Sequence, residues 1–580
     1  KNVLTCLMSN NINSQSVKHI IAPGGVSENE ESVKHGTWPS LANENKLVAI
    51  EASGASLDSG DLSDFEDDDE DNVSCFGRTG LKAREIRHIC DLAGPLLVSY
   101  MSANAMTATD QSIVGHLTTE IFTAMNLANA LMFGSLALST GIMNGLCTLA
   151  AQAFGAKKHR MVGIWLQVTL VWTTLLLVVP TGVLWWFTGS LVQLFSPDTS
   201  EVVAGYAATF ARWSLLWLLP ATVFNALCVW MEAVEVVVPQ TIISVVFVLV
   251  NFGLNYLFVF GGGSDHYALG LIGSPLATAV SKLLQLVVLL AVVYLTPILR
   301  RCWTPWSRTC LKWVLVKEFF KLGIPIMVTE VLYDWVFEVV LFYVASLVHG
   351  DDVLISATGL LVNVLFFLTP LLLCIYIAVS VRVGNHLGDN DPEGAKVAAK
   401  IAIQLAVGLA LFGGALFYFL RDYIAIIYTS DKAVIAKTAT FAPLVALDFV
   451  ISSMSYVLQG ILEGQGRPHS ATLTGIIGNW LVGLGLVFLL GQWLSKTSAV
   501  AGLTGVWLGI VAGEGVKMIL LGCFVATSNW QELAHAAVAR AELEEQAEQE
   551  DVERLAVALG MAEPNNTGDF SDERTSLLLN

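Results

Sequence analysis

The sequence predicts an all-α polytopic membrane protein with twelve transmembrane helices in two pseudo-symmetric six-helix bundles. Three observations predict this class: an apolar composition, many apolar segments of transmembrane length, and an internal repeat. Of the 580 residues, 54% are hydrophobic and 14% are charged, and a soluble protein of this size carries more charge. Segments such as 168–186 and 241–260 approach the roughly 20 residues that span a bilayer.

The first half of the chain contains six such apolar stretches, separated by loops that carry charged, glycine or proline residues. Asp198 stands three residues before Glu201, which is the spacing of a helix cap. We expect helices at 88–113, 120–150, 161–190, 201–231, 238–262 and 269–296.

The second half repeats this pattern of apolar stretches. Asp391 is expected to cap a helix whose first turn holds Pro392 and Glu393, because proline is favoured at the first helical position and acids in the first turn. We expect helices at 314–347, 353–383, 394–420, 432–461, 469–492 and 501–526.

The net charge of −18 belongs to the two ends of the chain. It divides equally between residues 1–80 and 528–580, and acidic and basic residues balance in between. Acidic ends of this kind usually stay solvated and unfolded, so the net charge says nothing about a substrate. The nine cysteines are scattered and lack the spacing of a metal site or a disulfide framework. We expect no cofactor and no nucleic-acid partner.

Lysine and arginine concentrate before the first helix and in every second loop, which predicts that both termini are cytoplasmic. Residues 530–559 are expected to form a charged, solvent-facing helix. We expect an acidic disordered cytoplasmic segment at 1–82, a first bundle at 83–296, a cytoplasmic linker at 297–312, a second bundle at 313–527 and an acidic cytoplasmic segment at 528–580.

The two halves share short segments at a nearly constant offset. "GLIGSPL" at 270–276 recurs as "GLTGVWL" at 502–508. Gly155 pairs with Gly388, and Asn251 pairs with Asn479. Because the repeat covers six helices, both halves enter the membrane in the same direction. Parallel repeats with a binding site between them are typical of transporters.

Several motifs together resemble the multidrug and toxic compound extrusion (MATE) transporters over residues 83–527. The most specific is "VRVGNHLGDNDPEGAK" at 381–396. Others are "DQSIVGHL" at 110–117, "TLAAQAFGAKK" at 148–158, "LPATVFNALCVWMEA" at 219–233, "VPQTIISVVFVLVNFGLNYLF" at 238–258, "GLIGSPLATAVS" at 270–281 and "LQGILEGQGRPH" at 458–469. The resemblance implies two six-helix lobes around a cavity that opens alternately to each side. It also implies efflux of organic solutes in exchange for H⁺ or Na⁺.

Asp110 is a carboxylate inside the first predicted span. Such a group costs on the order of 2.5–3.5 kcal/mol to insert, so it usually faces a cavity and has a function. The alternative is that Asp110 touches water at the outer end of its helix. Asn251 and Asn255 lie one turn apart on one face of the fifth helix. These amides either form part of a site or hold neighbouring helices together.

The resemblance assigns these residues a role. In archaeal and bacterial members, an aspartate at this point belongs to a cation or proton site inside the first lobe. Matched by motif, that site comprises Asp110, Asn251, Asn255 and Thr278. Asn255 stands where those members carry a second aspartate, so the site has one acid instead of two. A single acid favours H⁺ over a metal cation.

The seventh helix carries three carboxylates, Glu330, Asp334 and Glu338, spaced as one stripe. A stripe of acids is expected to line a wet cavity or to meet buried donors. Some of the acids, Glu330 first among them, are alternatively buried helix–helix contacts. Asp448 adds a carboxylate in the tenth helix. The expected substrate cavity comprises Asp334, Glu338, Glu330, Asp448, Tyr333 and Trp335.

The resemblance is imperfect in the second lobe. Eukaryotic members usually carry an essential glutamate two residues before the tryptophan of the seventh helix, and this position is Tyr333. The family acid of the tenth helix falls on Ser452, and Asp448 lies one turn earlier. We therefore expect the first lobe to carry the ion coupling, with Asp334 and Glu338 contributing to substrate binding.

The predicted function is a secondary active antiporter, not an enzyme. The acids of the second lobe suggest organic cations or xenobiotics as substrates. The alternative is a flippase for lipid-linked precursors, but twelve spans and a cavity with carboxylates argue against it. The sequence has no nucleotide-binding motif and no catalytic constellation, which disfavours an ATP-driven pump and a membrane-embedded enzyme.

The end of the chain carries a pattern that resembles an acidic dileucine sorting signal. Glu573 precedes Leu577 and Leu578 by four and five residues, as in signals that adaptor complexes bind. A pattern this short also arises often by chance. We expect a monomer in the vacuolar, lysosomal or plasma membrane.

Overall fold

The computed structural model describes residues 75–196, 199–263, 268–348, 351–427, 429, 431–543 and 546. The described helices belong to one compact unit. The predictions for the acidic segment before residue 75, for Asp198, and for Glu573, Leu577 and Leu578 lie outside these residues. The described part of the chain is helical without strands, which confirms the all-α class.

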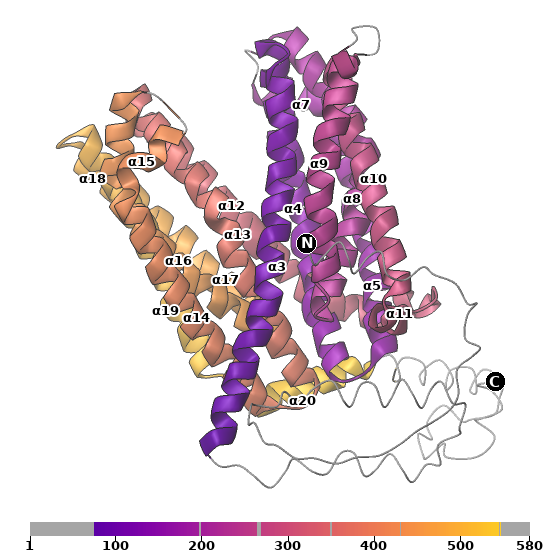
Figure 1. Cartoon of the computed structure of the whole chain (residues 1–580). Helices are drawn as coiled ribbons and strands as arrows, with labels where there is room; N and C mark the ends of the chain where they lie inside the picture. The colour runs from indigo at the N-terminus through magenta and orange to yellow at the C-terminus, as the bar shows by residue number, and fades with distance from the viewer. Residues whose placement is uncertain are drawn as a thin grey trace, which may run out of the picture. The chain divides into compact units, whose positions relative to one another are not determined.

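The first bundle contains the six predicted helices of the first half (Figure 1). A π-helical turn at Thr174–Val178 joins α5 to α6 just before Pro180, so these two form one span. The helices are α3 Cys75–Gly115, α4 Thr119–Gly155, α5 His159–Thr173, α6 Val179–Trp186, α7 Thr188–Phe195, α8 Glu201–Ala233, α9 Val238–Phe260 and α10 Gly273–Leu295.

The second bundle contains the other six spans, after a short α11 at Pro297–Cys302. A π-helical segment at Ile476–Gly483 joins α17 and α18 into one span. The helices are α12 Trp313–Leu347, α13 Asp352–Gly388, α14 Pro392–Phe419, α15 Arg421–Ile424, α16 Lys432–Gly464, α17 Pro468–Gly475, α18 Leu484–Ser495 and α19 Ala499–Ala526. The last described helix is α20 Trp530–Ala541.

Ten of the twelve spans are long and apolar enough to cross a membrane. The other two lie in α3 and α12, which are 41 and 35 residues long. Both contain polar groups that lower their apolar character: α3 begins with a charged segment, and α12 carries Glu330, Asp334 and Glu338. The position of these polar groups determines the candidate site.

Two helix starts are capped by side chains of the described residues. The Asp391 carboxylate accepts a 2.8 Å hydrogen bond from the Gly394 amide, and Pro392 opens α14, as predicted. The cap of α8 is different. The Ser200 hydroxyl accepts the bond from the Val203 amide, so Ser200 is the N-cap of α8. Serine, adjacent to the helix, satisfies the free amide directly.

The prediction of a solvent-facing helix after residue 530 is also wrong for α20. Ala534, Ala537 and Ala541 are buried, and the helix packs on α4, α13 and α14. The small alanines permit this contact, while Gln531, Glu532 and His535 are exposed on the other face. Figure 1 shows α20 at the end of the unit where the two bundles lie closest together.

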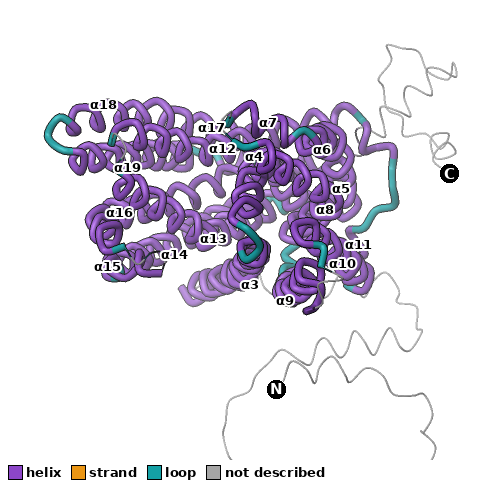
Figure 2. The backbone as a smooth tube through the Cα atoms, turned by 90° about the horizontal axis from the view of Figure 1, so that it is seen from above, coloured by secondary structure: helices purple, strands orange, loops and turns teal. Residues whose placement is uncertain are grey.

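The two bundles pack together through α4, which contacts both α12 and α13. Gly155 and Gly388, which the repeat pairs, both lie in this contact. A Cβ atom on Gly155 would lie 2.0 Å from the Asn385 carbonyl oxygen, and one on Gly388 would lie 2.0 Å from that of Gln152. The repeat also pairs Gln152 with Asn385, so this contact is itself two-fold symmetric. In the view from above, α4 lies between α12 and α8 (Figure 2).

Candidate functional site

The structure brings the four predicted residues of the first bundle together. Asp110, near the end of α3, is half-buried. Its Oδ1 accepts a 2.8 Å hydrogen bond from Asn255 Nδ2 in α9, and its Oδ2 accepts a 2.8 Å bond from Thr278 Oγ1 in α10. Asn251 Nδ2 donates to Thr278 Oγ1 at 3.4 Å, and Asn255 Nδ2 also lies 3.1 Å from Asn251 Oδ1. Three helices thus meet at one carboxylate.

The partners of Asp110 are neutral donors. Asn251 and Asn255 are fully buried, so bulk water does not solvate this side of the carboxylate. The Oδ1 atom of Asn255 is buried and has no hydrogen-bond donor. A buried acceptor without a donor costs free energy. The arrangement has the chemistry of a site for a small cation.

A cavity of about 330 Å³ lies between the two bundles. It contains charged groups of both signs, namely Glu232, Lys282 and Glu330. The Glu232 carboxylate accepts a 3.0 Å bond from Gln240, and the Lys282 ammonium lies 5.6 Å from the ring centre of Phe224. Other lining residues include Ser99, Ser102, Ala103 and Met106 of α3, Asn144, Asn225, Gln285, Leu373 and Ile377. This size and mixed lining fit a small organic ligand.

The predicted cavity residues of the second bundle separate in the structure. Glu330 lines the cavity. Asp334, Trp335 and Glu338 are exposed on α12, and Tyr333 is half-buried. Asp448 is buried in α16, and its Oδ1 has no hydrogen-bond donor. The lining of the cavity also includes Glu232, Lys282 and Gln240, which the prediction did not include.

A buried polar group lies inside the second bundle. Glu514 Oε1 accepts a 2.9 Å bond from Asn479, and the Lys517 ammonium is 3.3 Å from the same atom. Lys517 also lies over the rings of Tyr333 and Tyr456, 5.4 and 5.9 Å from their centres. Asn479 is the repeat partner of Asn251, so each bundle uses this asparagine to contact a polar group on a neighbouring helix.

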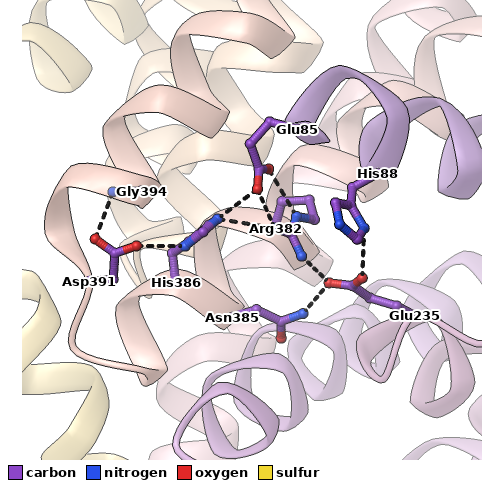
Figure 3. Close-up of polar contacts among 8 residues, drawn as sticks. All are labelled: Glu85, His88, Glu235, Arg382, Asn385, His386, Asp391 and Gly394. Atoms are coloured by element: carbon purple, nitrogen blue, oxygen red, sulfur yellow. Dashed lines mark hydrogen bonds and ion pairs between the residues drawn. The ribbon is translucent and has the colours of Figure 1, made fainter. Parts of the chain in front are cut away.

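A second set of polar contacts joins the two bundles near α20. We call Glu85, His88, Glu235, Arg382, Asn385, His386 and Asp391 the Arg382 cluster (Figure 3). Arg382 of α13 donates to both oxygens of Glu85 in α3, at 3.1 and 2.5 Å, and to Glu235 Oε1 at 2.6 Å. Asn385 donates to the same Glu235 oxygen at 2.6 Å. Glu85 and Glu235 belong to the first bundle and Arg382 to the second, so the cluster crosses the interface.

Histidines extend the cluster on both sides. His386 Nε2 lies 3.2 Å from Glu85 Oε1, and its Nδ1 lies 3.0 Å from Asp391 Oδ2. His88 Nδ1 lies 3.7 Å from Glu235 Oε2. Glu85 precedes the predicted membrane span. Burial alone would raise the pKa of its carboxyl, but hydrogen bonds from His386 and Arg382, with their charge, lower it to about 2. Glu85 is therefore an ionised partner.

The opposite side of the interface is also joined by buried hydrogen bonds. Thr148 Oγ1 donates to the Glu463 carbonyl at 3.1 Å, and Gln152 Nε2 donates to the Gly464 carbonyl at 2.9 Å. The Glu463 carboxylate accepts bonds from Gln459 and from the Tyr376 hydroxyl. These interface residues were not predicted individually. Many of them fall in the motifs at 148–158, 381–396 and 458–469, which is the signal that points to them.

Comparison with known proteins identifies the same two halves of the chain. A family model described as MatE matches residues 95–257 and again residues 325–489, which confirms the internal repeat. Multidrug and toxin extrusion protein 1 of Xenopus tropicalis is 27% identical over 463 residues, 79% of this chain and 77% of that protein. Protein DETOXIFICATION 51 of Arabidopsis thaliana is 27% identical over 455 residues, 78% and 82% of the two chains.

Solved structures show the same fold. The crystal structure of the eukaryotic MATE transporter AtDTX14 superposes with a TM-score of 0.72 at 24% identity, covering 80% of this chain and 100% of that one. The family model, the relatives and the fold agree, and the chain belongs to the MatE family of multidrug and toxin extrusion transporters.

Proposed function

We propose that this transporter is a secondary active antiporter, which exports organic solutes by alternating access in exchange for H⁺. The observation that carries the proposal is the Asp110 carboxylate, held by Asn255 and Thr278 with no cationic side chain among its hydrogen-bond donors. One carboxylate with neutral donors suits a proton better than a metal cation, which prefers more oxygen ligands. Asp110, Asn251, Asn255 and Thr278 are the proposed coupling residues.

Helix α3 is the element that would transmit the proton. Asp110 lies one turn beyond Met106, and Ser99, Ser102, Ala103 and Met106 line the cavity. The same helix contains Pro95, whose carbonyl accepts a 2.9 Å bond from Thr241 in α9. Proline interrupts the hydrogen bonding of a helix and permits it to bend. Protonation would weaken the charge-assisted bonds of Asp110, which frees the end of α3 and changes the cavity wall.

The cavity favours a cationic organic solute. Glu232 and Glu330 supply two carboxylates, and Lys282 supplies one ammonium, so with all three ionised the lining carries a net negative charge. The aromatic rings of Tyr100 and Phe224 in the same lining suit a flat or quaternary cation. An acidic lining also disfavours the flippase alternative, because lipid-linked precursors carry phosphate. The exposed Asp334 and Glu338 remain proposed as further substrate contacts.

The orientation follows from the basic residues. Arg301, Arg308 and Lys317 lie in or beside the linker between the bundles, and the positive-inside rule supports a cytoplasmic linker and cytoplasmic termini. The five predicted parts of the chain, the monomeric state, and a vacuolar, lysosomal or plasma membrane stay proposals. So does binding of an adaptor complex through Glu573, Leu577 and Leu578.

The test is uptake of a radiolabelled quaternary ammonium ion into proteoliposomes under an imposed pH gradient or Na⁺ gradient. We expect the pH gradient to drive uptake and Asp110→Asn to abolish this drive, while Asp110→Glu retains part of it. Glu338→Gln is the matched control that removes an acid from α12 and is expected to change the apparent KM more than the proton dependence. Unchanged proton-driven uptake in Asp110→Asn would remove Asp110 from the mechanism.

A further inference from the structure

Helix α20 lies across the interface between the two bundles, near the Arg382 cluster. Its first half packs with the apolar core around α13 and α14 through Trp530, Leu533, Ala534 and Ala537. Leu543, just beyond its end, packs against the apolar core of α4, α5 and α8 in the first bundle. One short helix therefore contacts both bundles at the end where they meet (Figure 1).

Arg540 makes the polar contacts of this helix. Its guanidinium donates to Gln152 Oε1 in α4 of the first bundle, and its Nε lies 3.3 Å from Glu318 Oε1 in α12 of the second. The side chain is 14% exposed, and that of Glu318 is 15% exposed. A mostly buried arginine with one partner in each bundle stabilises the arrangement in which the bundles touch.

Arg540 occupies a position that the internal repeat relates to that of Arg382. The turn after α8 holds Glu235 at φ 61°, and the turn after α16 holds Gly466 at φ 73°. Arg382 and Asn385 bind Glu235. On the other side, a Cβ atom on Gly466 would lie 2.6 Å from Arg540 Nη1. The turn after α8 thus carries an acid that binds Arg382. The turn after α16 carries Gly466, and Arg540 occupies the space that a side chain would take there.

The interface amides follow the same symmetry. Asn385 reaches across to Glu235, and its repeat partner Gln152 reaches across to the Gly464 carbonyl while its oxygen binds Arg540. The second bundle supplies Arg382 from its own α13. The repeat-related position in α4 of the first bundle is the apolar Leu149, so the second arginine comes from outside the repeat, on α20.

We propose that α20 is a strap that holds the two bundles together at this end, and that Arg540 is a gate residue of the transport cycle. The strap must leave Gln152 or Glu318 whenever the bundles separate there. The segment after α19 is then a regulatory element, since any partner that withdraws α20 favours separation. The proposal rests on the proposed alternating-access function, because only a transporter that opens this end needs a removable contact.

Hydrogen exchange of the full-length protein in lipid nanodiscs tests the strap without requiring transport. The readout is amide exchange at residues 148–157 and 381–390, the facing ends of α4 and α13. Arg540→Ala removes both polar contacts, and losing a charged hydrogen bond is expected to raise local opening at least about 10-fold. Arg540→Lys keeps a charge near Glu318 and is expected to fall in between.

Two further variants make the result specific. Ala537→Asp places a carboxylate at a fully buried position and is expected to detach the whole helix, giving exchange at least as fast as Arg540→Ala. His535→Ala changes an exposed residue of the same helix and is the matched control. Residues 201–215 of α8, at the other end of the bundle, are expected to exchange alike in all variants.

The outcomes separate the strap from the transport proposal. Faster exchange at both α4 and α13 in Arg540→Ala, confined to that interface, supports the strap even if no variant or wild type transports the quaternary ammonium ion. Exchange equal to that of His535→Ala in both Arg540→Ala and Ala537→Asp overturns the strap, whether or not uptake is driven by protons.

Discussion

Arg382→Ala is the substitution expected to weaken the contact between the bundles most. The guanidinium donates three hydrogen bonds to two carboxylates, and the side chains of Arg382 and Glu85 are 11% and 7% exposed. Removing one member of a buried ion pair costs about 3–5 kcal/mol, because the remaining charge is left uncompensated. Glu85 keeps His386 at 3.2 Å, so we expect the lower end of this range.

A loss of about 3 kcal/mol corresponds to a roughly 100-fold larger opening constant at this end of the molecule. The assay is hydrogen exchange at residues 82–92 and 381–390, in nanodiscs at neutral pH. Arg421→Ala is the control, because Arg421 pairs with Asp422 only at 4.0 Å, with side chains 34% and 66% exposed. Such an exposed pair contributes about 0–1 kcal/mol.

The double variant Arg382→Ala with Glu85→Ala distinguishes lost attraction from lost packing. Removing Glu85 as well eliminates one of the two carboxylates that lose their arginine, so the double variant is expected to open less than the sum of the single variants predicts. Exchange in Arg382→Ala no faster than in Arg421→Ala would refute the reasoning, since the cluster would then contribute nothing to closure.

Three other predictions concern separate parts of the structure. The folded-state pKa of Glu85 is lowered from 4.5 to about 2, so its stabilising contribution is present above pH 4.5 and is lost as the pH falls toward 2. The difference in melting temperature between wild type and Glu85→Gln should therefore be constant above about pH 5 and shrink below it. A constant difference down to pH 2 would contradict this. Gly155→Ala places a methyl group against a backbone carbonyl, so we expect a destabilisation of about 1–3 kcal/mol and faster hydrogen exchange in α13. In the control Gly205→Ala, the new methyl group meets nothing within 4 Å, and the variant should gain about 0.5–1 kcal/mol of stability from helix propensity. Equal melting temperatures for the two variants would be inconsistent with the tight contact. Lys517→Met leaves the buried Glu514 without its cation and should lower stability by about 3 kcal/mol or more. The double variant with Glu514→Gln should recover part of this loss in a thermal-unfolding assay. A double variant no more stable than Lys517→Met alone would contradict the pairing.

The helices were predictable because apolar length alone specifies a transmembrane span. The errors lie at polar ends. The first helix was predicted to begin at 88, but α3 begins at Cys75. Before residue 88, Glu85 binds Arg382 and His386 of α13, and the local sequence cannot reveal these partners. Helix α20 was predicted to face solvent for the same reason: its alanines pack against helices that are distant in sequence.

The residues of the candidate site also divide into those that the sequence predicts and those that it does not. Asp110, Asn251, Asn255 and Thr278 were predictable because a polar residue in an apolar span is conspicuous and the motifs align it. Glu235 and Arg382 were not, since each lies near a helix end where charge is ordinary, and their pairing joins residues far apart in one chain. Only the three-dimensional contact between the repeats turns these charges into partners.

Helix α3 links the proposed parts of the transport cycle in one continuous helix. Asp110 lies near one end, the cavity-lining residues from Ser99 to Met106 lie in the middle, and Glu85 of the Arg382 cluster lies near the other end. A proton that loosens Asp110 from α9 and α10 changes the packing of a helix whose far end binds the second bundle. Coupling then requires no separate signalling path, because the helix that carries the proposed proton site also carries Glu85 of the Arg382 cluster at its opposite end. Substitution of Pro95 by alanine would straighten and stiffen this helix, and proton-driven uptake should slow while hydrogen bonding at Asp110 and Glu85 is retained. Unchanged uptake in Pro95→Ala would show that bending of α3 is not the coupling step.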